Sequence, residues 1–396
     1  MGLDNMKVRG FKAGAVAAGL KKDGKTDLAI IFSEHEAVAA AAFTTNRVKA
    51  APVLVSQENI RDGKVRAILA NAGNANACTG ERGMADAREC ARLAAESLKI
   101  SEDEVLVAST GVIGEPLRME LLKKAIPGLA SSLSPDGFPE VAKALMTTDS
   151  FPKESMYLGE AEGKTYLIRG MAKGAGMIMP NMATMLSFIL TDLAIDHDRL
   201  DRALKSSVKT TFNRITVDGD TSTNDMVIVL ANGEAGNETL SEADYAAFKK
   251  GLERVMEDLA RMIVRDGEGA SCTFQVNVTN AASASEAERA ARVVANSCLV
   301  KTAVCGRDPN WGRIMAALGR SDIVFDERDV DIFIDEVRIV KGGLAEGGDA
   351  EKEASGRMKK NDFVLRIDLK KGEFQDRIYT CDLTHDYITI NADYRS

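Results

Sequence analysis

The chain has 396 residues, of which 45% are hydrophobic and 28% are charged, the balance of an ordinary globular protein. That length predicts two or three domains, or one large two-lobed unit. The 51 basic and 59 acidic side chains give a net charge of −8, which argues against a protein that binds nucleic acid through a basic face.

Membrane and metal functions are also disfavoured by the sequence. The longest uncharged stretch, Gly174 to Thr191, contains Gly, Pro and Asn near its middle, so a membrane-spanning helix is not expected. The apolar piece Ala13–Leu20 is too short and too rich in Ala and Gly for a signal peptide, and a cytoplasmic protein is expected. No CxxC, zinc-spaced Cys/His pair or Gly-rich phosphate loop occurs, so no metal or cofactor is expected.

The first half alternates strand-like and helix-like segments. Short apolar runs predict buried strands at Leu28–Phe32, Ala67–Ala70 and Val105–Ala108. Apolar residues at helical spacing predict a helix over Met84–Ile100, and a second helix opens with proline at Pro139–Met146.

The second half begins with an apolar strand from Thr184. It continues with a predicted amphipathic helix over 198–212, and a strand at Met226–Leu230 that Asn232-Gly233 closes. Capping boxes at Ser241 and Ser285 predict helices of roughly 25 and 12 residues.

The C-terminal quarter, from Asp322, changes to a period of two. This pattern predicts antiparallel strands that include 364–367, 378–381 and 387–390, and the Gly- and charge-rich stretch 341–360 predicts a mobile surface loop. The mixture of helices and antiparallel strands indicates an α+β fold of layered sheets and helices.

Thr184 stands where a loop containing Gly174, Gly176, Pro180 and Asn181 runs into an apolar strand. A hydroxyl nucleophile needs a base, and none of the three histidines lies in a catalytic motif. A threonine that cuts its own chain at Ala183–Thr184 gains a free α-amine as its base, with a pKa near ~8. The alternative is an ordinary β-branched residue that starts a strand after a turn.

Three other segments have the side chains that acyl transfer or amino-acid binding requires. Ser109-Thr110-Gly111 ends a predicted strand and can stabilise an oxyanion, or simply form a turn. Lys173 and Glu268 can pair with the carboxylate and amine of an amino acid, or face solvent. The segment Cys305–Arg313, with the single tryptophan, is either a binding loop or a tightly folded junction.

Taken together, these segments resemble the ornithine acetyltransferase family, also called glutamate N-acetyltransferase, of arginine biosynthesis. The resemblance spans nearly the whole chain in the expected order. The matching segments are 42–46, 71–80, 109–114, 146–149, 173–186, 217–225, 306–314 and 391–396.

The resemblance implies a role for each matching position. Thr184 would be the self-cleaving nucleophile, with Ala183 on the other side of the scissile bond, and Thr110 and Gly111 would stabilise the oxyanion. The implied substrate contacts are Thr147, Lys173, Thr184, Glu268, Asn391 and Ser396. The implied fold is an αββα-like sandwich, cut into chains 1–183 and 184–396 that stay together as an α2β2 heterotetramer.

The implied reaction is a ping-pong acetyl transfer from N2-acetylornithine to glutamate through an acetyl-threonine. Acetyl-CoA serves some family members as a second acetyl donor, and no residue here decides between the two groups. Two other classes of protein remain as alternatives: a self-processing aminopeptidase or amidase, in which water takes the acyl group, and a non-catalytic protein that binds amino acids.

Overall fold

The computed structural model describes residues 6–179 and 185–393. They form two compact units, each with its own core. Unit 1 takes its described residues from Met1–Asn213 and Asp220–Ile263, and unit 2 from Arg214–Gly219 and Val264–Arg395.

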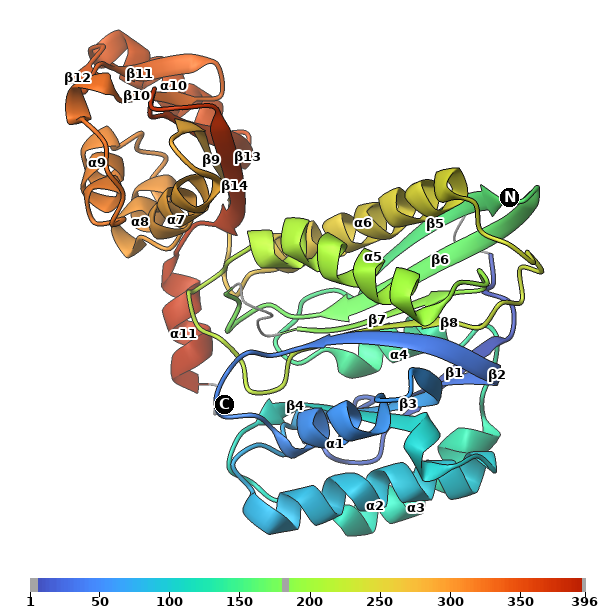
Figure 1. The fold of residues 1–396 in the computed structure, drawn as a ribbon. Coiled ribbons are helices and arrows are strands. Elements are labelled where there is room, and N and C mark those ends of the chain that lie inside the picture. The colour runs from blue at the N-terminus through green and yellow to red at the C-terminus, as the bar shows by residue number, and fades with distance from the viewer. Residues whose placement is uncertain (1–5, 180–184, 394–396) are drawn as a thin grey trace. The chain divides into compact units, whose positions relative to one another are not determined.

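Unit 1 is built on a mixed eight-stranded sheet (Figure 1). The strands follow the order β4-β3-β2-β8-β7-β6-β5, and β1 pairs with β2. Two neighbouring pairs, β3/β4 and β7/β8, are parallel, and the other pairs are antiparallel. The strands are β1 (Phe11–Val16), β2 (Leu28–Phe43), β3 (Lys64–Asn74), β4 (Val105–Val112), β5 (Lys153–Ala161), β6 (Lys164–Lys173), β7 (Leu186–Thr191) and β8 (Met226–Ala231).

The central strands β7 and β8 each have six residues, and all of these residues are buried. Their near-continuous apolar sequences suit strands that are covered on both faces. The strand predicted from Thr184 is confirmed from Leu186 onward, and Thr184 itself lies outside the described residues.

Helices cover both faces of this sheet. Helix α4 begins with Pro139 in its first turn and buries Phe138, Val141, Ala142 and Leu145, the spacing of one helical face. That face packs on one side of the sheet, whereas α2 and α3 pack on the opposite side of β2–β4. The helices of unit 1 are α1 (Ala51–Asn59), α2 (Gly80–Leu98), α3 (Met119–Ser131), α4 (Phe138–Leu145), α5 (His197–Thr210) and α6 (Glu242–Arg265), with short 3-10 turns at Glu102–Glu104 and Phe212–Arg214.

Unit 2 contains a second mixed sheet with the strand order β12-β11-β10-β13-β9-β14. Among the described strands of this sheet, only the pair β9 and β13 is parallel. Helix α7 packs on the sheet through four alanines and Val294. The strands are β9 (Thr273–Ala281), β10 (Asp331–Ile334), β11 (Val337–Lys341), β12 (Leu344–Ala345), β13 (Asp362–Asp368) and β14 (Phe374–Cys381). The helices are α7 (Ala284–Ala295), α8 (Cys298–Cys305), α9 (Trp311–Gly319), α10 (Gly348–Met358) and α11 (His385–Asp393), with a 3-10 turn at Glu327–Asp329.

Most predicted elements are confirmed, and the errors lie in unit 2. The predicted strand 387–390 is wrong, because these residues belong to helix α11. The predicted loop 341–360 contains helix α10. The strand predicted at 364–367 was expected to be antiparallel, and it pairs antiparallel with β10 but parallel with β9. Helix α7 is capped by Ser283, whose side chain accepts from the Glu286 N–H, and not by Ser285.

Among the described residues, no helix combines the length and the apolar character needed to cross a lipid bilayer.

Candidate active site

Thr110 and Gly111 lie at the end of β4, where the strand runs parallel to β3. Gly111 has a φ of +130°, and a Cβ at this position would come within 2.4 Å of the Gly73 carbonyl carbon. Only glycine tolerates both this backbone conformation and this close approach. The sequence Thr110-Gly111 therefore reflects a tight backbone packing at the strand end, with the Thr110 side chain half-buried beside it.

A buried asparagine fixes the backbone just before Thr110. The side-chain amide of Asn224 donates to the carbonyl oxygens of Ser109, at 2.8 Å, and Ala75, at 2.6 Å. On the same strand, the Ser109 hydroxyl donates to Asn71 Oδ1 at 2.6 Å. Both asparagines are buried, so these hydrogen bonds hold the strand end in one position.

A second cluster, which we call the Asp149 cluster, consists of Asp149, Lys153, Lys173 and the backbone N–H groups of Thr147 and Gly174. Asp149 Oδ1 accepts from Lys153 Nζ and from Gly174 N, each at 2.7 Å, and Oδ2 accepts from Thr147 N at 2.9 Å. Lys173 Nζ lies 4.0 Å from Asp149 Oδ2 and donates to Thr110 Oγ1 at 3.4 Å. The cluster therefore brings three of the predicted site residues, Thr110, Thr147 and Lys173, together in unit 1.

The electrostatics of this cluster favour a charged Asp149. Burial by itself raises the pKa of the Asp149 carboxyl, because it disfavours the ionised form. The ammonium groups of Lys173 and Lys153 and the hydrogen bonds from Lys153 and Thr147 outweigh burial and lower the pKa of Asp149 to about 2. One buried carboxylate thus faces two buried ammonium groups, and negative charge on a ligand would be favoured here.

Asp225 reaches the residue that follows Thr184 in the chain. It is buried directly before β8, and its Oδ1 accepts from the Met185 backbone N–H at 2.7 Å. The next backbone hydrogen bond, Met226 N to Met185 O at 3.1 Å, continues into the β7/β8 pairing. The chain immediately after Thr184 is therefore tied to a buried carboxylate.

The predicted contacts Glu268 and Asn391 both lie in unit 2. Glu268 is in the loop after α6, and its Oε2 accepts from Asn391 Nδ2 of α11 at 2.7 Å. Loop and helix approach closely, because a Cβ on Gly269 would lie 2.5 Å from the Tyr387 backbone nitrogen. This contact brings the two expected residues together.

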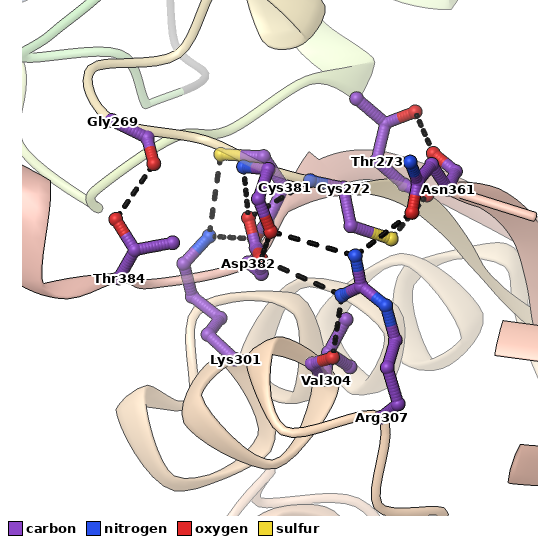
Figure 2. Close-up of polar contacts among 11 residues, drawn as sticks. Gly269, Cys272, Thr273, Lys301, Val304, Arg307, Asn361, Cys381, Asp382 and Thr384 are labelled. Atoms are coloured by element: carbon purple, nitrogen blue, oxygen red, sulfur yellow. Dashed lines mark hydrogen bonds and ion pairs between the residues drawn. The ribbon is translucent and has the colours of Figure 1, made fainter. Parts of the chain in front are cut away.

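A polar cluster around Asp382 holds the same loop in place (Figure 2). Asp382 accepts from the backbone N–H groups of Ser271 and Cys272, at 2.9 and 3.1 Å, and from the Ser271 hydroxyl at 2.5 Å. Thr384 donates to the Gly269 carbonyl oxygen at 2.6 Å. The Glu268 loop is thus fixed at several points along its length.

Arg307 belongs to this cluster and gives the 305–313 segment a structural role. Its guanidinium donates to Val304 O at 2.9 Å and to Asn361 Oδ1 at 2.8 Å, and lies 3.7 Å from Asp382 (Figure 2). These contacts favour the tightly folded junction over the binding loop for this segment.

Ala183, Thr184 and Ser396 lie outside the described residues. Within the described ranges, no three His, Cys, Asp or Glu side chains gather as metal ligands would.

Sequence reasoning assigned no role to Asp149, Asn224 or Asp225. All three stand in segments that carried the family resemblance, Asp149 two residues after Thr147 and the pair 224–225 directly before β8. A polar residue in the middle of a turn gives no hint that its side chain is buried against groups 25 to 149 residues away, such as Gly174 N for Asp149 and Ala75 O for Asn224. Only the fold reveals these contacts.

Comparison with known proteins decides the family. The ArgJ family model matches residues 12–396. The chain belongs to the ArgJ family. The arginine biosynthesis bifunctional protein ArgJ of Geobacter sulfurreducens is 52% identical to this member over 393 residues, which cover 99% of this chain and 100% of the relative.

Further ArgJ proteins support the assignment. The ArgJ protein of Caldanaerobacter subterraneus subsp. tengcongensis is 49% identical over 394 residues, covering 98% of this chain and 97% of the relative. The solved structure of the Bacillus halodurans ArgJ protein matches at 47% identity with a TM-score of 0.51, and it covers 53% of this chain and 100% of the solved chain. The protein is accordingly an acyltransferase of arginine biosynthesis, and the resemblance inferred from its motifs is confirmed.

Proposed function

We propose that this enzyme moves an acetyl group from N2-acetylornithine to glutamate through a covalent acetyl-threonine at Thr184. The observation that carries the proposal is the Asp149 cluster beside Thr110, where Lys173 Nζ lies 3.4 Å from Thr110 Oγ1. Buried positive charge next to a hydroxyl donor suits a site where an oxyanion develops and a carboxylate binds.

The first step of the proposed mechanism is self-cleavage. Thr184 Oγ1 attacks the Ala183 carbonyl carbon, the peptide C–N bond breaks, and the former amide nitrogen becomes the α-amine of Thr184. Water then hydrolyses the ester, which leaves chains 1–183 and 184–396. The hydrogen bond from Met185 N to Asp225 supports this step, because it fixes the backbone one residue beyond the scissile bond.

The strand order explains why the two chains would remain together. β7 and β8 would belong to chain 184–396, but they lie in the sheet between β2 on one side and β6 on the other, which would belong to chain 1–183. Separating the chains would break both antiparallel ladders and expose buried apolar strands. This arrangement supports the proposal that the two cleaved chains stay together in one layered fold. The αββα-like sandwich and its α2β2 assembly are part of the same proposal.

The solved relative gives independent support for cleavage. Residues 184–396 are 213 of 396, about 54% of the chain. The entire solved chain from Bacillus halodurans matches 53% of this chain, the length that one cleavage product would have.

After cleavage the Thr184 amine removes the proton of its own hydroxyl, directly or through water. The hydroxyl oxygen attacks the acetyl carbonyl of N2-acetylornithine, and Thr110 and Gly111 stabilise the oxyanion. Ornithine leaves with the proton, and glutamate then takes the acetyl group from Thr184 and departs as N-acetylglutamate. Thr147 and Lys173 in unit 1, Glu268 and Asn391 in unit 2, Thr184 and Ser396 are the proposed substrate contacts.

The variant Thr184→Ala tests the proposal. We expect one intact chain on a denaturing gel and no acetyl transfer, whereas the wild type gives two fragments. Mass spectrometry after incubation with N2-acetylornithine should find one acetyl group on wild-type fragment 184–396, at Thr184. Cleavage in Thr184→Ala, or full activity from uncleaved wild type, would refute the mechanism.

The relatives are named bifunctional proteins, which favours a second activity beside acetyl transfer from N2-acetylornithine. We propose that acetyl-CoA also acetylates Thr184, and that glutamate accepts this acetyl group as well. Incubation with acetyl-CoA and glutamate should then yield N-acetylglutamate. Glutamate-independent release of acetate from N2-acetylornithine would instead support a hydrolase.

A further inference from the structure

We propose that Lys173 is a positioning residue of the oxyanion site: it donates a hydrogen bond to Thr110 Oγ1, and Asp149 holds it there. The inference rests on the proposed function of Thr110 and Thr184 and gives Lys173 a role beyond substrate contact. Asp149, which no sequence motif assigned a role, becomes a second positioning residue that acts through Lys173.

The first step of the argument concerns the single proton of the Thr110 hydroxyl. A hydroxyl has one donor and two acceptor sites, whereas an ammonium group has three donors and no acceptor. Because Lys173 Nζ lies 3.4 Å from Thr110 Oγ1, the hydroxyl can only accept in this pair. Its own O–H then points elsewhere and remains available for the oxyanion.

The second step concerns the strength of that donor. A hydrogen bond accepted from an ammonium group polarises the hydroxyl, so its O–H becomes a stronger donor. Lys173 has only 5% of its surface exposed, so solvent weakens this effect little.

The third step concerns how Asp149 places the lysine. Its Oδ1 accepts from Gly174 N at 2.7 Å, which fixes the backbone directly after Lys173. Its Oδ2 lies 4.0 Å from Lys173 Nζ and attracts the head group without a close hydrogen bond. Lys153 takes the short 2.7 Å contact with Oδ1, so the Lys173 ammonium keeps donors for Thr110 and for substrate.

The test must separate this role from binding of a substrate carboxylate. p-Nitrophenyl acetate is an acetyl donor without a carboxylate, so a contact between Lys173 and a carboxylate cannot affect its reaction. The measured quantity is the rate at which it acetylates Thr184, per cleaved chain as counted by mass spectrometry. Thr184→Ala supplies the blank for reaction at other side chains.

We expect Lys173→Met to slow this acetylation by about tenfold, the size of one charge-assisted hydrogen bond. In the Thr110→Ala background, the same substitution should change the rate less than about threefold, because the hydroxyl it acts on is gone. Lys164→Met is the matched control, since Lys164 is exposed at the opposite end of β6 and should leave the rate unchanged. Lys173→Arg, which keeps a donor, should recover part of the loss.

Asp149→Asn provides a second measurement that retains Lys173. It should slow the same reaction by roughly threefold to tenfold, again only when Thr110 is present. Thermal unfolding of each variant shows whether it is folded, and Lys173→Met keeps the short Asp149–Lys153 pair, so it should fold.

The outcomes distinguish the two proposals. If the wild type does not acetylate Thr184 at all, the proposed function is wrong. If the wild type does so, and Lys173→Met either reacts as fast or loses the same factor with and without Thr110, only the positioning role of Lys173 is overturned.

Discussion

Each unit contains a buried aspartate at the centre of its main polar cluster, and the two aspartates have different partners. The side chains of both Asp149 and Asp382 are 0% exposed. Asp149 bonds an ammonium group at 2.7 Å, and a second lies at 4.0 Å. Asp382 bonds two backbone N–H groups and a hydroxyl, and the nearest guanidinium, that of Arg307, lies 3.7 Å away.

Both aspartates fix backbone N–H groups, but only Asp149 also forms a short ion pair with a lysine and lies near a second lysine. Asp149 holds Lys153 and Lys173, and Lys173 donates to Thr110, so the loss of Asp149 should affect chemistry as well as folding. Asp382 fixes the course of the Glu268 loop, and the cation Lys301 in the same cluster is held by Thr380 and by the Cys381 carbonyl oxygen (Figure 2). Its loss should affect folding and substrate affinity and leave the acyl-transfer step nearly unchanged.

The largest expected effect is on stability. Asp149→Ala should lower the free energy of unfolding by about 3–5 kcal/mol, because it leaves two buried ammonium groups without their carboxylate. Asp382→Ala should cost only about 1–3 kcal/mol, the cost of buried neutral donors that lose their acceptor. Urea denaturation of both variants measures the two values, and equal losses would contradict the distinction between the two clusters.

The next largest expected effect is on kcat, and it differs between the hydroxyls of Thr110 and Thr384. Thr110→Ala should lower kcat by about 10²-fold, since one oxyanion donor is removed. Thr384→Ala, which removes the hydrogen bond to Gly269 O in unit 2, should change kcat less than about threefold and raise KM. Steady-state kinetics with N2-acetylornithine and glutamate separate the two, and Thr110→Ser should restore much of the lost rate. A kcat for Thr110→Ala equal to that of the wild type would remove Thr110 from the mechanism.

The same two regions show how far the sequence predicts the structure. In unit 1, continuous apolar runs and a proline-started helix predicted β7, β8 and α4 nearly to the residue, because burial on both faces leaves a clear pattern. In unit 2, Tyr387–Ile390 alternates like a strand but forms part of α11, and none of the residues of this helix is buried. Alternation over four residues is too short to distinguish a strand from an exposed helix, because no buried face marks the period.

The candidate site divides in a similar way. Thr110, Thr147 and Lys173 were predicted from motif residues, and the structure brings them together around Asp149. The importance of Asp149 itself could not be predicted, because its contacts with Lys153, Lys173 and Gly174 depend on how β5 and β6 pair. Sequence patterns indicate which side chains have the required chemistry. The residues that hold those side chains in place, such as Asp149, are identified only once the strand pairing is known.

The smallest expected effect is the pH dependence of the Asp149 contribution to stability. The pKa of Asp149 in the folded chain is about 2, below its usual value of 3.8. A carboxyl group with a lowered pKa stabilises the fold fully above its unfolded pKa and loses that contribution as pH falls through the folded value. Between about pH 5 and pH 2, the fold should therefore lose about 2 kcal/mol from this group alone.

Asp149→Asn isolates this contribution, because it removes the titrating group while every other carboxyl group titrates as before. The difference in unfolding free energy between wild type and Asp149→Asn, from urea denaturation, should be largest at pH 5 and shrink by about 2 kcal/mol towards pH 2. The difference shrinks because protonated Asp149 is neutral like asparagine and no longer attracts Lys153 and Lys173 as an anion. A difference that stays constant over this range would mean that the two lysines do not hold Asp149 in its charged form, and the electrostatic contrast between Asp149 and Asp382 would fail with it.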